Sequence, residues 1–122
     1  MNASDAPAPA GQYSQAVEVT GATRTLYISG QVGLGIDGAI PTDTAAQAAI
    51  VWANLAAQLR AAGMGIENLV KITTIVANHA DVAAVRAGRA AVLGNHRPAS
   101  TLIIGGLADL AWKVEVEGIA VA

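Results

Sequence analysis

Hydrophobic and polar residues alternate near the end of the chain, between Trp112 and Val121. The alternation sets Trp112, Val114 and Val116 against Lys113, Glu115 and Glu117. A period of two predicts a β-strand with one buried and one polar face. Beyond Glu117 the charged face becomes apolar, at Ile119 and Val121. The two carboxylates therefore lie either at the edge of a buried surface, where a pKa can shift and chemistry can occur, or on a solvated edge strand.

Four further stretches have the pattern of strands. Tyr13–Val19 and Thr25–Gln31 flank a short turn-forming segment, and they predict a hairpin in which Gly21 supplies the unusual backbone angle. Asn68–Ala77 has two faces of similar character, which predicts a central strand covered on both sides. The apolar run Thr101–Ile104 predicts a strand that precedes the last one.

Two stretches predict helices. Thr44 with Gln47 three residues later resembles a capping box, and Gly63 is a natural stop for the first helix. Its apolar residues share one face at helical spacing: Ala48, Val51, Trp52, Leu55, Leu59 and Ala62. A shorter helix is expected from about Asp81 to Leu93, with Gly94 as its stop.

Arg86 and Arg89 lie three residues apart in the second predicted helix. The pair either binds an anionic ligand or forms part of a solvated helix face, which is the commoner arrangement for such residues. His79 and His96 are isolated and have no partner at metal-ligand spacing, so no metal site is predicted. Ser29 lies in no GxSxG context, which disfavours a catalytic triad.

The order of these elements predicts an α+β domain in which two helices pack on one face of a mixed sheet. A chain of 122 residues is one domain, with residues 1–10 as a flexible lead-in and residues 11–122 as the folded part. Because the chain supplies no third layer, self-association is the simplest cover for the other sheet face. A mean hydropathy of +0.46 without a run long enough to cross a bilayer also indicates a buried interface.

Composition and charge exclude several classes of protein. The absence of cysteine removes disulfides, thiol nucleophiles and sulfur metal sites, and it fits a cytoplasmic protein. A formal charge of −2 with seven scattered basic residues provides no surface for nucleic acid. The glycine-rich segment Ser29–Gly38 lacks the Lys-Ser/Thr of a phosphate loop. The first ten residues lack the features of a signal peptide, and no membrane partner is expected.

Five blocks of sequence carry a resemblance to a known family. They are Ala8-Pro9 with Gly11–Val17, Ile28–Val32, Asn68–Thr74, His96–Ser100 and Val114–Val121. With these blocks in register, the chain resembles the reactive-intermediate deaminases (RidA or YjgF), often labelled endoribonuclease L-PSP or translation inhibitor, from about Ala8 to Ala122. The resemblance implies a chorismate-mutase-like fold and a homotrimer whose sheets line a central barrel. It also implies three clefts between subunits, each of which binds a small-molecule metabolite.

The same resemblance implies a set of site residues and a reaction without a cofactor. In the deaminases a tyrosine, a Ser-Gly pair, a glutamate and an arginine line the cleft. The tyrosine falls on Tyr13, the pair on Ser29 and Gly30, and the glutamate on Glu115. Glu115 is thereby expected to be the catalytic group, while the other three shape the pocket and bind the substrate.

The arginine that clamps the substrate carboxylate does not carry over. Where the deaminases read Arg-Pro-Ala-Arg-Ser, this chain reads Arg97-Pro98-Ala99-Ser100-Thr101, so Ser100 takes the place of the guanidinium. A further asparagine of the cleft falls on Arg86. Either Arg86 replaces the lost guanidinium from another wall, or the ligand has no carboxylate there and Ser100 donates a neutral hydrogen bond.

Three functions are compatible with these residues. The leading hypothesis is a RidA-like hydrolase that converts enamine or imine metabolites to carbonyl compounds and ammonia, with a substrate preference altered by Ser100. The alternative is a trimeric small-molecule-binding protein that keeps the cleft but does not catalyse the reaction. An endoribonuclease or translation inhibitor follows only from the family label, and the charge does not support it.

Overall fold

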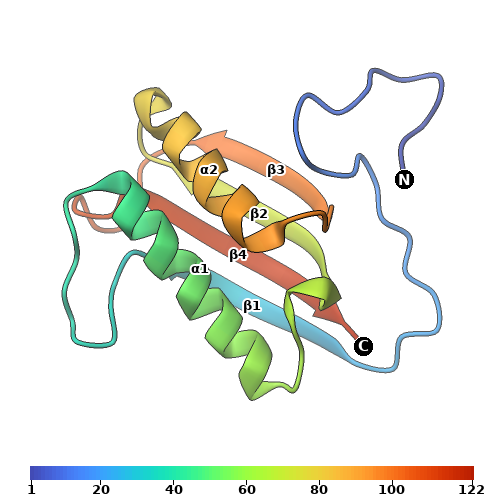
Figure 1. Ribbon diagram of the computed structural model, residues 1–122, viewed down its shortest axis with the longest axis horizontal. Coiled ribbons are helices and arrows are strands. Elements are labelled where there is room, and N and C mark those ends of the chain that lie inside the picture. Colours follow the sequence, from blue (N-terminus) through green and yellow to red (C-terminus); the bar gives the residue numbers. More distant parts are fainter.

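Four strands and two helices form two layers in the computed structural model, which describes all residues from 1 to 122 (Figure 1). The elements are β1 (Thr25–Val32), α1 (Thr44–Ala61), β2 (Leu69–Val76), α2 (Val82–Leu93), β3 (Ala99–Ile104) and β4 (Val114–Val121). Short 3-10 turns precede β2 and α2, at Ile66–Asn68 and His79–Asp81. Both helices lie on the same face of the sheet, and no helix is both long and apolar enough to cross a membrane.

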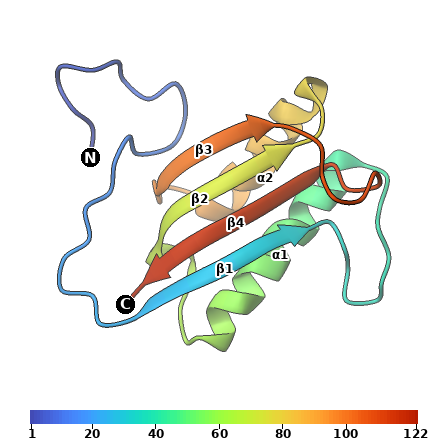
Figure 2. The same cartoon turned by 180° about the vertical axis from the view of Figure 1, so that it is seen from behind.

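The last strand of the chain, β4, lies inside the sheet, whose order is β1-β4-β2-β3. It runs antiparallel to both β1 and β2, whereas β2 and β3 are parallel because α2 returns the chain between them. The predicted mixed sheet with two helices on one face is therefore confirmed. The prediction that β2 is a central strand is confirmed. The prediction that both of its faces are covered is wrong for a single chain, because the helices cover only one face of the sheet (Figure 2).

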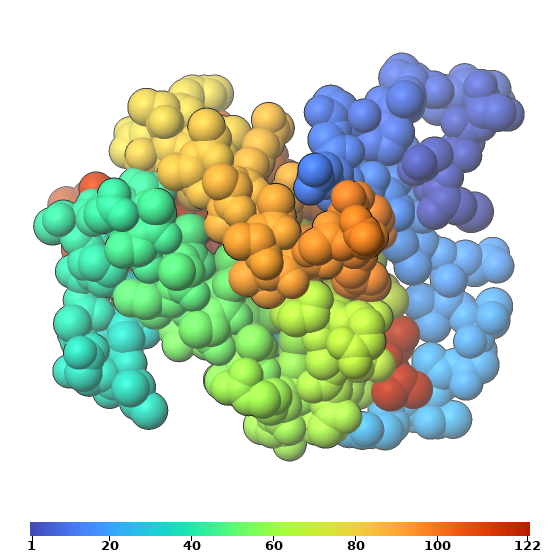
Figure 3. Space-filling model, viewed as in Figure 1, coloured from blue at the N-terminus to red at the C-terminus, as the bar shows by residue number.

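The predicted N-terminal hairpin is wrong. Only its second half forms a strand. Ser14 lies at the opposite edge of the sheet, next to β3, and the chain then passes the C-terminal end of β4, where residues 17–22 line a cavity with Val70 and Val121 (Figure 3). Ser14 makes an isolated parallel bridge with Ala99, and its hydroxyl donates a hydrogen bond to the carbonyl of Arg97. These contacts hold the segment next to β3 and bring Tyr13 toward the start of that strand.

The hydrophobic core fills the space between the helices and the sheet. Its fully buried members include Val51, Leu55 and Trp52 of α1, Ile72 and Val76 of β2, and Val116 and Ala120 of β4. The alternation predicted for the last strand is confirmed, because Val114 and Val116 are buried while Glu117 is exposed. Side chains on the same face as Glu117 therefore point away from both helices.

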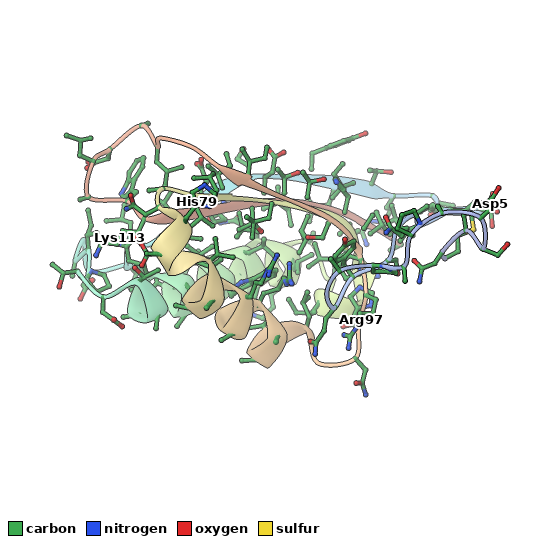
Figure 4. All side chains as sticks on the ribbon, turned by 90° about the horizontal axis from the view of Figure 1, so that it is seen from above. Asp5, His79, Arg97 and Lys113 are labelled. Carbon is green, nitrogen blue, oxygen red and sulfur yellow. The ribbon has the colours of Figure 1, made fainter.

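The other side of the sheet, which we call the open face, has no covering layer in the single chain (Figure 4). The residues whose side chains lie on it include Tyr27, Lys71, Thr73, Ile75, Ile103, Glu115, Glu117 and Ile119. Tyr27 is 77% exposed and Ile103 is 47% exposed. Large exposed apolar side chains on an uncovered sheet face are typical of a protein interface.

Helix α1 begins differently from the prediction, and the difference fixes the start of β4. The N-cap is Asp43, whose carboxylate accepts a hydrogen bond from the Ala46 N–H. Gln47 is fully buried instead. Its amide donates to the carbonyls of Pro41 and Ala111 and accepts from the Lys113 N–H: the N···O distances are 2.8, 2.8 and 2.9 Å. Helix α1 is thereby bonded to the residues just before β4.

We predict that Gln47→Ala lowers the free energy of unfolding by roughly 2–4 kcal/mol, because three partly buried backbone groups lose their partner and the buried side chain leaves a cavity. Gln58→Ala, an exposed change in the same helix, should alter it by less than about 0.5 kcal/mol. Urea denaturation of both variants measures the difference. Equal losses in the two variants would contradict this role of Gln47.

Candidate functional site

Three of the predicted site residues line one cavity beside α2 and β3. The cavity has a volume of about 200 Å³ and is lined by Gly11, Tyr13, Arg86, Arg89, Ser100 and Leu102. We call it the helix-side cavity. Tyr13, Arg86 and Ser100 were predicted from the family motifs, whereas the motifs did not predict Arg89. The N-terminal segment, helix α2 and strand β3 each contribute a wall.

Strand pairing explains how Ser100 comes to face this cavity. In the parallel pairing of β2 and β3, Ile72 lies opposite Ser100 and Thr74 lies opposite Leu102. Ile72 and Thr74 are buried beneath the helices, so Ser100 and Leu102 point to the same side. Tyr13 reaches the cavity from the N-terminal segment that lies beside β3, and its hydroxyl accepts a hydrogen bond from the Ala10 N–H at 3.3 Å.

Arg89 is the most deeply placed charge of the cavity. It lies on the inner side of α2 between Val85 and Leu93, and only 8% of its surface is exposed. Its guanidinium donates a long hydrogen bond of 3.5 Å to the Ser100 hydroxyl. Burial lowers the pKa of Arg89, and the positive charges of Arg86 and Arg97 lower it further, while Tyr13 acts in the opposite direction. No carboxylate contributes to this balance.

The prediction that both arginines of α2 belong to a solvated face is therefore wrong for Arg89. Arg86 is exposed and lies at the wall of the same cavity. This position is compatible with the other alternative, in which the two arginines bind an anionic ligand. A signal for Arg89 exists in the sequence, because it is four residues from both Val85 and Leu93 and so occupies a core-facing position. The motif comparison drew attention to Arg86 instead.

Glu115, Gly30 and Ser29 lie elsewhere, at a β-bulge on the open face. Ile28 pairs with Gly118 and Gln31 pairs with Val116, so both Ser29 and Gly30 lie opposite the single residue Glu117. Such bulges redirect side chains and occur often beside functional sites. Ser29 lines a cavity of about 280 Å³ on this face, together with residues such as Tyr27, Lys71 and Thr73.

The Glu115 side chain lies directly against Gly30. A Cβ atom built on Gly30 would be 2.5 Å from the Glu115 Oε1 and 2.7 Å from its Cδ. The two residues line a smaller cavity of about 90 Å³ with Thr73, Ile75 and Glu117. A glycine is thus required at position 30 for the carboxylate to lie where it does, against the backbone of the bulge.

The structure therefore divides the predicted site into two halves on opposite faces of the sheet. Ser100 lies opposite Ile72, on the side of the helices, whereas Glu115 lies opposite Ile75, on the open face. The sheet separates the two groups within one chain, so no small ligand can touch both of them there. A site that uses both halves needs a second copy of the chain.

Comparisons with known proteins establish the family. The chain matches the family described as Endoribonuclease L-PSP over residues 3–122. It is 35% identical to a 2-iminobutanoate/2-iminopropanoate deaminase of Mus musculus, over 99% of this chain and 89% of that protein. The chain thus belongs to the L-PSP family, which is the RidA/YjgF family indicated by the motifs.

Solved structures agree with this assignment. A protein of unknown function of the conserved Rid family from Yersinia pestis superimposes with a TM-score of 0.80 at 35% identity, over 91% of this chain and 87% of that one. E. coli TdcF, solved with bound serine, superimposes with a TM-score of 0.76 at 27% identity, over 96% and 93% of the two chains. The mixed sheet with two helices is thus the fold of this family.

We predict that Gly30→Ala displaces the Glu115 carboxylate until ordinary van der Waals contact, about 3.5 Å or more, is restored. The effect on stability should be small, because the flexible end of a side chain can give way. A crystal structure of the variant measures the displacement. Gly106→Ala is the matched control, since nothing lies within 4 Å of the added methyl group there. An unmoved carboxylate in Gly30→Ala would refute the contact.

Proposed function

We propose that this chain is a cofactor-independent enamine/imine deaminase, which hydrolyses small reactive imines to carbonyl compounds and ammonia. Relatives at about 35% identity carry the name of 2-iminobutanoate/2-iminopropanoate deaminase. The observation that carries the proposal is the Glu115 carboxylate, placed against the Gly30 bulge at the wall of a small cavity. A carboxylate at the wall of a small cavity can carry protons between water and an imine, which is what imine hydrolysis needs.

The working site would form between copies of the chain in a homotrimer. The helix-side cavity of one copy would meet the open face of the next, which brings Tyr13, Ser100 and the arginines to Glu115 and Gly30. The split of these residues over two sheet faces supports this arrangement. The exposed Tyr27 and Ile103 on the open face support it as well, because a closed ring of unlike contacts buries one such face in every subunit.

Glu115 would act as the proton carrier of the reaction. Starting from the protonated imine, it takes a proton from water as the water oxygen bonds to the imine carbon, which gives a neutral carbinolamine. It then returns this proton to the nitrogen, the carbon–nitrogen bond breaks and ammonia leaves, and the hydroxyl group gives its proton to the carboxylate as the carbonyl forms. For an enamine substrate, the protonated carboxyl group first protonates the carbon. The Gly30 N–H, at the bulge, is the candidate donor to the substrate's polar end.

Substrate preference would differ from that of the related deaminases because Ser100 replaces a guanidinium. A hydrogen bond to a charged group contributes about 1.5–3 kcal/mol, so the loss of a bidentate contact weakens binding of a simple acid by roughly tenfold to a hundredfold or more. Unless another residue compensates, simple imine acids would be poor substrates, and the cleft would serve to bind other small molecules. Ser100 is therefore also the observation that favours the alternative, a small-molecule-binding protein of the same fold.

The direct test generates 2-aminoacrylate in place with a pyridoxal-dependent dehydratase and follows formation of the keto acid. We predict that the native chain accelerates hydrolysis over a control without protein, and that Glu115→Gln removes the acceleration while the circular dichroism spectrum stays unchanged. Glu18→Gln, a change to an exposed carboxylate outside the site, should keep full activity. A fully active Glu115→Gln variant would remove Glu115 from the mechanism.

A second measurement separates the enzyme from the binding protein. If the native chain gives no acceleration with aminoacrylate or other small imines, yet keto acids raise its melting temperature, the binding function is correct. Stabilisation together with turnover supports the deaminase. The serine bound to the related TdcF supports the choice of small amino-acid-like ligands for this screen.

A further inference from the structure

We propose that Arg89 of helix α2 binds the acidic group of the ligand in the helix-side cavity, and that Arg86 binds a second acidic group at its rim. The preferred ligand is then a small acid with two anionic groups rather than one. The inference rests on the proposed function for the identity of the cavity as a ligand site. It assigns to a helix the guanidinium that the related deaminases carry on a strand.

The first step of the argument is that Arg89 lacks a partner for its charge. A guanidinium has five N–H donors in a planar fork, and Arg89 uses one of them, in the 3.5 Å contact with Ser100. The side chain is more than nine-tenths buried, and buried charges are normally paired. Desolvation and two neighbouring positive charges lower the pKa of Arg89, so an anion in the cavity would relieve an existing electrostatic cost.

The second step is that two other arginines of the chain, Arg24 and Arg97, have structural partners that account for them. Arg97 donates to the carbonyls of Gly94 and His96, and Arg24 donates to the carbonyl of Ala62. Arg97 lies near the end of α2, beside the N-terminal segment (Figure 4). Arg89 bonds to no carbonyl and faces a cavity instead, which is the placement of a ligand-binding residue.

The third step concerns the exchange of positions between β3 and α2. Ser100 is short and neutral, and it is the group that Arg89 contacts. An arginine at position 100 would bring a second guanidinium against the buried one, so the two arrangements exclude each other. The serine at position 100 and the arginine on the inner side of α2 are therefore compatible with each other, and they place the guanidinium on the helix wall of the cavity instead of the strand wall.

The fourth step concerns the second charge. Arg86 lines the same cavity, is exposed, and has no hydrogen bond to another residue of the chain. Its charge acts on Arg89, which shows that the two guanidiniums lie within electrostatic range of each other. A ligand with one carboxylate leaves one of these charges unpaired, whereas a ligand with two acidic groups neutralises both. The two arginines therefore favour ligands with two acidic groups over ligands with one.

The test measures binding of unreactive acids, so that it does not depend on turnover. Propionate, succinate and inorganic phosphate are titrated by calorimetry into the native chain, Arg89→Leu, Arg86→Gln and the control Arg60→Gln, which alters an exposed arginine at the end of α1. We predict that succinate binds the native and control proteins more tightly than propionate. Arg89→Leu should weaken succinate binding about tenfold or more, and Arg86→Gln should reduce it to the level of propionate.

A double variant makes the test specific to position. Ser100→Arg combined with Arg89→Leu returns the guanidinium to β3, and it should recover propionate binding that Arg89→Leu alone has lost. Arg89→Leu should fold at least as stably as the native chain without ligand, because it replaces an unpaired buried charge by an apolar group. A large loss of stability in Arg89→Leu would instead assign the residue a structural role and overturn the inference.

Three further results would overturn the proposal. Succinate affinity unchanged by Arg89→Leu would remove Arg89 from the site, and equal affinity for propionate and succinate would remove the second charge. Binding of phosphate alone would mean that the cavity takes one compact dianion rather than two acidic groups. These outcomes are independent of the deaminase assay. If Arg89→Leu keeps full deaminase activity, the proposed function is retained and this inference fails. If the chain binds diacids but catalyses no hydrolysis, this inference is retained and the proposed function fails.

Discussion

Alternation of side chains across the sheet is the constraint on which the arrangement of this protein depends. Helices cover one face only, so each strand residue either joins the core and its edge cavity or points to the open face. Ser100 falls on the first side and Glu115 on the second. Residues that the sequence motifs predict for one site therefore lie on two surfaces. Only an assembly of several copies can bring them together in one site. In this account oligomerisation is a condition for the site as well as for stability.

In the helix-side cavity, a neutral residue of β3 contacts a charged residue of α2 that lies eleven residues earlier in the sequence. Ser100 leaves the strand wall neutral, and Arg89 supplies the positive charge from α2. A buried guanidinium without an acidic partner is costly unless a ligand neutralises it. A ligand with an acidic group would remove this cost. The absence of an arginine at position 100 therefore does not by itself indicate that the anion site is lost.

Much of the fold could be predicted from the sequence, because periodic patterns report local burial. The alternation around Glu115, the apolar face of α1 and the turn at Gly63 correctly indicated the last strand and the first helix. The hairpin at Tyr13 failed for a physical reason: the partner of that segment is Ala99, more than eighty residues away, and local pattern carries no information about such pairing. Gln47 was misassigned as a cap because its three bonds reach loops that local pattern does not place next to α1.

Some residues of the candidate site could likewise be predicted from the sequence, and others could not. Motifs predicted Glu115, Gly30 and Ser29 as site residues, and the strand register places all three at or beside the bulge. They could not show that Arg89, rather than Arg86, lies deepest, because that depends on the rotation of α2 over the sheet. Arg89 did interrupt an apolar stripe, which was the available signal. The contact of Glu115 with Gly30 could not be predicted, because the pattern within each strand does not show which residues of two strands lie side by side.

The most direct test of the divided site is subunit complementation. Ser100→Phe fills the helix-side cavity and Glu115→Gln removes the carboxylate from the open face, so each variant alone should be inactive with 2-aminoacrylate. If the two are unfolded, mixed equally and refolded together, half of the cavities and half of the open faces are intact, and about a quarter of the clefts should combine them. Recovery of about a quarter of the native activity is the predicted result. A mixture as inactive as its parents would contradict a site shared between copies.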